Sequence, residues 1–104
     1  GWPEVPSYSA ARGGVIALTR QLAVDFGMKG VRINTICPGP TLSPRVSGYL
    51  EGGAIDADRL LGSVPLGRFA TCEEVANVIA FVAGEGASFI HGAAITVDGG
   101  QTSF

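Results

Sequence analysis

The feature that most constrains the fold of this chain is an alternation of helical and strand patterns along its 104 residues. Over residues 9–26, apolar side chains recur every three or four positions, which predicts an amphipathic helix. The β-branched run at 31–36 predicts a strand after a short turn. A second helix after Thr71 and a strand at 93–97 follow. This helix, strand, long loop, helix, strand order predicts an α/β fold with parallel strands joined by crossovers.

Local residues mark where these elements begin and end. Two prolines among the first six residues predict an extended segment over residues 1–7. Gly27 is placed to end the first helix. Thr71 followed three residues later by Glu74 is a capping box, which predicts the start of the second helix, and Gly84 predicts its end.

Residues 41–64 form the least regular part of the sequence, with short helical stretches separated by glycines. A long excursion of this kind between regular elements is usually a lid or binding loop. Its apolar residues would line a pocket, and Arg45 or Arg59 could meet an acid group of a substrate. The apolar residues concerned are Tyr49, Leu50, Ile55, Leu60 and Leu61. The same residues could equally pack the loop against the rest of the chain.

Composition and charge exclude several classes of function. The net charge is -2 and the basic residues are scattered, which argues against nucleic acid as a partner. No apolar run approaches the ~20 residues that cross a bilayer, so no membrane partner is predicted. His91 is the single histidine, and Cys37 and Cys72 lack metal-site spacing, so we expect no metal site. Free thiols in a reducing, cytoplasmic compartment are the favoured state of both cysteines.

Tyr8 and Arg12 stand four residues apart at the opening of the first predicted helix. Residues at this spacing share a helix face, so the phenol and the guanidinium can lie side by side. A free phenol stays protonated near neutral pH, whereas a neighbouring cation favours phenolate. The pair could therefore be a tyrosine tuned to move a proton, or an accident on a solvated surface.

Four stretches of sequence, in order, resemble the C-terminal part of the short-chain dehydrogenase/reductase family, including its 3-oxoacyl-[acyl-carrier-protein] reductase-like members. They are "YSAAR", "VRINTICPGP", "PLGRFATCEEVANVIAFVAGEGASFIHG" and "AAITVDGG". The resemblance implies the C-terminal part of a Rossmann-like, doubly wound parallel sheet. Residues 1–104 would then be one portion of a single domain, without its N-terminal dinucleotide-binding half. The missing initiator methionine and the lack of a glycine-rich phosphate turn agree with that expectation.

The resemblance also implies an activity. NAD or NADP would exchange a hydride with the carbonyl or alcohol carbon of a small molecule. Tyr8 would be the acid/base, and Arg12 would take the position of the family's lysine, which supports the tyrosine and holds the cofactor ribose. The residues implied to bind the cofactor are Tyr8, Arg12, Pro38, Gly39, Pro40, Thr41 and Ser43. Asn34 and His91 are interpreted as structural.

Arg12 is a departure from the family pattern, because arginine keeps the charge but cannot give up a proton. We therefore expect impaired catalysis, and no measurable turnover from these residues alone. The alternative is a non-catalytic remnant or cofactor-binding pseudo-enzyme that acts by assembling with other subunits. A flavodoxin-like binding domain is disfavoured, since it would not require the tyrosine and the Pro-Gly loop in this order.

The first helix resembles the surfaces through which the family forms homo-oligomers, dimers or tetramers. The apolar stripe of Val15, Leu18 and Leu22 fits such a surface and equally fits burial in the core.

Overall fold

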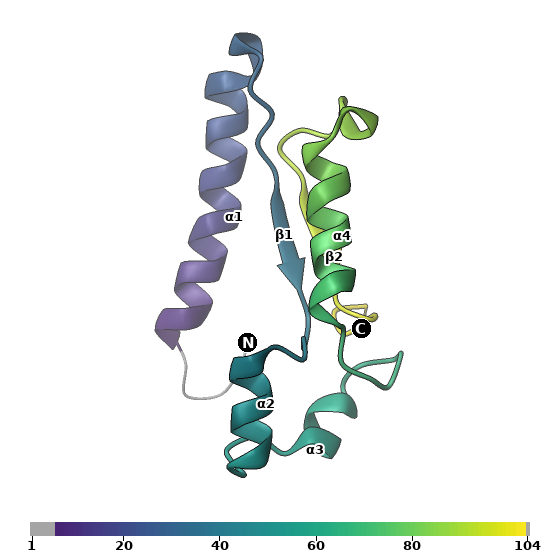
Figure 1. Cartoon of the computed structure of the whole chain (residues 1–104). Coiled ribbons are helices and arrows are strands. Elements are labelled where there is room, and N and C mark those ends of the chain that lie inside the picture. The colour runs from purple at the N-terminus through teal and green to yellow at the C-terminus, as the bar shows by residue number, and fades with distance from the viewer. Residues whose placement is uncertain (1–5, 104) are drawn as a thin grey trace.

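The computed structural model describes residues 6–103 and has the predicted α/β order (Figure 1). Helix α1 (Pro6–Phe26) leads through the 3-10 turn η1 (Gly27–Lys29) to strand β1 (Thr35–Pro38). Helices α2 (Pro44–Glu51) and α3 (Ala57–Leu61) occupy the segment predicted as a long loop. Helix α4 (Cys72–Ala83), the 3-10 turn η2 (Glu85–Ala87) and strand β2 (Ala94–Val97) complete the chain.

The two strands pair in parallel, from Thr35 opposite Ala94 to Pro38 opposite Val97. Helices α1 and α4 run alongside them, while α2 and α3 lie beyond the end of β1 toward which its arrow points (Figure 1). The start of α1, the end of β1 and helix α2 therefore gather at one end of the molecule. Ligands of open α/β sheets bind at this carboxyl end of the strands.

The start of α1 differs from the prediction of an extended segment over residues 1–7. Residues 1–5 lie outside the described residues, but Pro6 and Ser7 belong to the helix. Proline is tolerated in the first helical turn, because its missing N–H would have no intrahelical partner there. Pro6 thus starts the helix that carries Tyr8, instead of preceding it.

Strand β1 begins at Thr35, four residues later than predicted. The backbone of Ile33 pairs irregularly, donating to His91 Nδ1 at 3.1 Å and accepting from Gly92 N at 2.7 Å. Gly92 has a φ of 70°, which interrupts the partner strand and delays the regular ladder until Ala94. The interpretation of Asn34 as structural is confirmed, because its side chain forms hydrogen bonds with the backbone of the loop that leads into β2.

The inward face of α1 is not the apolar stripe, for which the sequence left an oligomer surface and core burial equally open. Thr19 and Ala23 are the buried residues of the helix, and the Thr19 hydroxyl is satisfied by donating to Val15 O at 2.8 Å. Val15 and Leu18 remain 52% and 56% exposed. The other buried hydrophobic side chains of the described residues are Leu60, Val64, Val82 and Ala87. The stripe on α1 is therefore not core within residues 6–103, and its role as a surface for oligomerisation stays a prediction.

Candidate functional site

A cavity of about 740 Å³ opens where the start of α1, the end of β1 and helix α2 meet. Every residue implied above to act in catalysis or cofactor binding lines it. These residues are Tyr8, Arg12, Pro38, Gly39, Pro40, Thr41 and Ser43. The fold therefore brings residues from two distant parts of the sequence to one site.

Tyr8 and Arg12 are neighbours on α1, as their spacing predicts. The Arg12 Cζ atom lies 5.6 Å from the centre of the Tyr8 ring. Arg12 Nη2 also donates to the carbonyl oxygen of Pro38 at 3.4 Å, so its guanidinium reaches from α1 to the end of β1. The permanent charge thus stands beside the phenol and against the loop that follows the strand.

Hydrogen bonds fix the backbone of the loop after β1 at both of its ends. Gly39 N donates to Val97 O at 2.9 Å, extending the ladder by one bond beyond Pro38. The Thr41 hydroxyl donates to Gly39 O at 3.0 Å, which closes a tight local turn. Ser43 is the N-cap of α2, and its Oγ accepts from Val46 N at 3.2 Å. The hydroxyl of Ser43 remains able to donate to a ligand, because capping uses only its acceptor capacity.

The excursion over residues 41–64 contributes part of the lining that was predicted from it. Tyr49, Ile55 and Leu60 line the cavity, and Leu50 and Leu61 are not among its lining residues. Of the two arginines considered for an acid group, Arg45 lines the cavity and Arg59 does not. Arg45 Nε donates to the Tyr49 hydroxyl at 3.0 Å.

One support of the site is not predicted from the sequence, and a second group, Asp98, shapes the turn after β2. Ala70 pairs with the loop after β1: its N–H donates to Pro40 O, and its carbonyl accepts from Leu42 N, both at 2.9 Å. Asp98 accepts from the backbone of Gly100 and from Thr102, and the Thr102 hydroxyl above all lowers the pKa of its carboxyl. The pairing of Ala70 is a tertiary contact between distant segments, which no local pattern reveals, whereas the bonds of Asp98 are local, to residues two and four positions later.

Of the remaining candidates, His91 and Cys72 do not line the cavity, whereas Cys37 does. His91 bridges two elements, because its Nδ1 accepts from Ile33 N and its Nε2 lies 2.7 Å from Ala23 O. With Nδ1 accepting, Nε2 carries the proton and donates to that carbonyl. Cys37 lines the cavity and Cys72 is exposed, and both are free thiols. Among residues 6–103, no three histidine, cysteine or acidic side chains cluster as metal ligands would.

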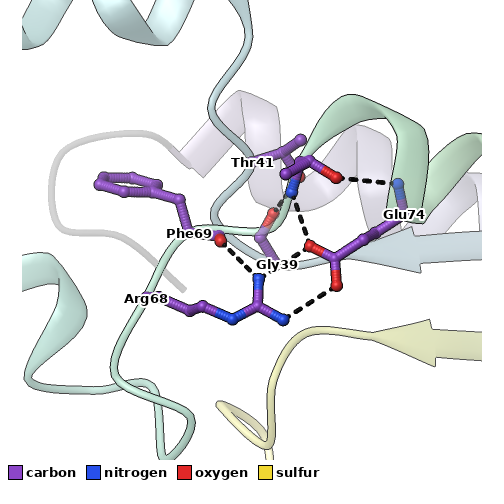
Figure 2. A network of polar contacts seen from close by, with 6 residues as sticks. Gly39, Thr41, Arg68, Phe69 and Glu74 are labelled. Atoms are coloured by element: carbon purple, nitrogen blue, oxygen red, sulfur yellow. Dashed lines mark hydrogen bonds and ion pairs between the residues drawn. The ribbon is translucent and has the colours of Figure 1, made fainter.

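Glu74 and Arg68 form an ion pair at the start of α4 (Figure 2). Arg68 Nη1 and Nη2 donate to the two carboxylate oxygens at 2.8 and 2.9 Å. Thr71 N also donates to Glu74 Oε1, and the Thr71 hydroxyl accepts from Glu74 N, which confirms the predicted capping box. Arg68 above all, with the Thr71 amide, lowers the pKa of Glu74 from its ordinary 4.5 to about 2.

This lowered pKa predicts an acid-dependent loss of stability. A carboxyl whose pKa falls on folding stabilises the native state above its unfolded pKa, and this contribution is lost as the pH falls through the folded value. For Glu74 the window runs from about pH 4.5 down to about 2. Urea unfolding across that window should show a shallower decline of the unfolding free energy in Glu74→Gln. Glu73→Gln, one residue earlier, should keep the native slope, and equal slopes in all three proteins would contradict the prediction.

Known proteins can be compared with this site and fold. Residues 1–102 match the family model described as enoyl-(acyl carrier protein) reductase. The chain is 40% identical over 99% of its length to 2-(S)-hydroxypropyl-CoM dehydrogenase 3 of Xanthobacter autotrophicus, covering 42% of that protein. It is similar to an oxidoreductase of the short chain dehydrogenase/reductase family from Burkholderia thailandensis, at 36% identity and a TM-score of 0.86, over 95% of this chain and 38% of that one. It is also similar to ElxO with bound NADP, at 32% identity and a TM-score of 0.91, over 100% of this chain and 42% of that one.

The chain belongs to the short-chain dehydrogenase/reductase family, which confirms the resemblance drawn from the four motifs. Its fold is α/β with two parallel strands and matches the C-terminal part of the family's Rossmann fold. The chain spans about two fifths of the length of the curated relative that it matches. None of the helices in the described part has the length and hydropathy needed to span a membrane.

Proposed function

We propose that these residues are the catalytic and nicotinamide-facing part of an NAD- or NADP-dependent oxidoreductase acting on a small carbonyl or alcohol. The observation that carries this proposal is the convergence of Tyr8, Arg12 and the loop after β1 on one cavity. Membership in the family supports it.

The cavity lining suits such a cofactor. Its charged side chains, among the residues described, are the two guanidinium groups of Arg12 and Arg45. A positively charged lining attracts a dinucleotide, which carries a diphosphate. We assign the holding of the carboxamide-bearing ring to main-chain groups of Pro40 and Thr41 and to the Ser43 hydroxyl, three residues that line the cavity. A bound nicotinamide dinucleotide would supply or accept the hydride.

In this proposal the chain's own residues handle the proton. Tyr8 donates its phenolic proton to the oxygen of a carbonyl being reduced, and takes a proton from an alcohol being oxidised. The Arg12 guanidinium lies beside the ring, with its Cζ 5.6 Å from the ring centre, so its positive charge is close to the oxygen on which donation leaves a negative charge. Arg12 cannot itself relay that proton onward, because a guanidinium stays protonated in proteins.

The expected result of replacing Arg12 by lysine, in the full natural polypeptide that carries this sequence, is a rise of about tenfold in kcat. An ammonium group is compact and can exchange its proton, whereas the guanidinium is planar and fixed in charge. Steady-state kinetics with NADH and NADPH would measure the change. If kcat does not rise and Tyr8→Phe is equally harmless, the pair has no part in catalysis.

A second candidate function is a cofactor-binding subunit without turnover, and Arg12 itself favours it. Its guanidinium is engaged with the carbonyl of Pro38 and ties α1 to β1. Under this alternative, titration followed by nicotinamide fluorescence shows binding, while both Arg12 and Arg12→Lys proteins lack turnover.

A further inference from the structure

The loop after β1, residues 39–42, is held from two sides. On one side Gly39 N bonds Val97 O, the last residue of β2. On the other side Ala70 pairs with it as a short parallel bridge, through the bonds to Pro40 O and from Leu42 N. The first support belongs to the sheet itself. The second belongs to an irregular segment between α3 and α4, which needs a support of its own.

That support is the carboxylate of Glu74. Arg68, two residues before Ala70, binds it with both Nη atoms, and Thr71 N, one residue after Ala70, donates to Oε1 at 3.0 Å. Arg68 Nη1 also donates to Phe69 O at 3.0 Å, which fixes the peptide directly before Ala70. Figure 2 shows the guanidinium, the Phe69 carbonyl and the carboxylate together, beside Gly39 and Thr41.

The residues on both sides of Ala70 are therefore hydrogen-bonded to one carboxylate, that of Glu74 at the start of α4. A bidentate arginine–carboxylate pair fixes orientation as well as distance. Arg68 and Glu74 do not line the cavity, whereas Phe69 does. The pair can act on a bound molecule only through the segment that it holds.

We propose that Arg68 and Glu74 are positioning residues, which fix Ala70 and thereby hold the main chain of Pro40 and Thr41 in place for the nicotinamide cofactor. This inference rests on the proposed function of the site. An exposed ion pair contributes only modestly to global stability, so most of its effect should be local. The pair sets the precision of the loop and leaves the fold as it is.

The first measurement is amide hydrogen exchange at Ala70 and Leu42 in the full natural polypeptide, followed by NMR. In Arg68→Ala these two amides should exchange about fivefold faster, because the bonds that they make lose their support. Amides of β2, such as that of Ile95, should keep their native rates. Native rates at Ala70 and Leu42 in Arg68→Ala would overturn the proposal, whether or not the protein binds a cofactor.

The second measurement separates positioning from a merely structural role. Arg68→Ala and Glu74→Gln should each raise the KM for the nicotinamide cofactor about fivefold while kcat stays within about twofold. Glu74→Gln keeps an acceptor for Thr71 N, so it isolates the ion pair from the cap. Arg68→Lys should restore part of the affinity, and Glu73→Gln should leave KM as it is.

If Arg68→Ala shows faster exchange at Ala70 and Leu42 but an unchanged KM for the cofactor, the ion pair holds the loop without affecting cofactor binding. That result would overturn the proposal. Failure of the unsubstituted protein to bind NADH or NADPH would overturn the proposed function instead. The exchange rates would then still decide whether the pair holds the loop.

Discussion

Tyr8→Phe should lower kcat of the full natural polypeptide by about two to four orders of magnitude, because the variant keeps the ring and loses the proton. The phenol lines the cavity beside Arg12, in the first turns of α1. Removing its oxygen leaves the aromatic packing and the cation–ring contact with Arg12 in place. The KM for the cofactor should therefore change by less than about threefold. Steady-state kinetics and a fluorescence titration with NADH and NADPH would measure the two quantities separately.

Tyr49→Phe is the matched control for this prediction. Tyr49 is also a phenol of the cavity lining, but its hydroxyl accepts from Arg45 on the same helix. Loss of one exposed hydrogen bond should change kcat by less than about threefold. Equal effects of the two substitutions on kcat would show that Tyr8 only lines the cavity and does not transfer a proton.

The elements with local signals could be predicted from the sequence. Thr71 and Glu74 cap α4 reciprocally, and both groups lie within one helical turn, so the pattern contains the whole interaction. The four-residue spacing of Tyr8 and Arg12 likewise suffices to predict that the two side chains are neighbours on the helix. Each of these depends on residues a few positions apart and on no distant partner.

Elements that depend on distant partners were placed less well. The β-branched run at 31–36 predicted an early strand, but the ladder needs an extended partner, and Gly92 prevents one before Ala94. The side chain of Arg32 explains what this segment does instead. It donates to the carbonyls of Val82, Gly84, Ala87 and Ile90, at distances from 2.8 to 3.3 Å.

The orientation of α1 could not be read from hydrophobicity alone. The apolar stripe containing Val15 and Leu18 stays exposed, while the polar Thr19 is buried with its hydroxyl bonded to its own helix. A threonine that satisfies its hydroxyl internally can face a neighbour as a small side chain. The residues of α1 and of the loop after β1 that the family resemblance names do line one cavity, whereas Ala70, which bonds that loop from 30 positions away, has no local signal.

Gly39 is one of the residues implied to bind the cofactor, and the structure shows that its position requires glycine for a separate, steric reason. A Cβ atom at this position would lie 2.7 Å from the Cα of Asp98 and 3.1 Å from its carbonyl oxygen. Both are backbone atoms, and the added atom would also lie 2.7 Å from the Cβ of Asp98. The Asp98 side chain is itself held by its hydrogen bonds with Gly100 and Thr102. The neighbour cannot give way without moving the turn after β2.

Gly39→Ala should therefore lower the unfolding free energy by about 1–3 kcal/mol, as expected when an atom is forced into filled space. The shift of the loop should also weaken nicotinamide binding, since Pro40 and Thr41 follow directly. Urea unfolding and a fluorescence titration of the full natural polypeptide would measure both effects.

Gly48→Ala is the matched control: Gly48 lies within α2 with no atom within 4 Å of its added Cβ. It should raise the unfolding free energy by about 0.5–1 kcal/mol, because alanine favours a helix over glycine. Equal stability of Gly39→Ala and the native protein would show that the turn at Asp98 yields, and that the close approach does not require glycine.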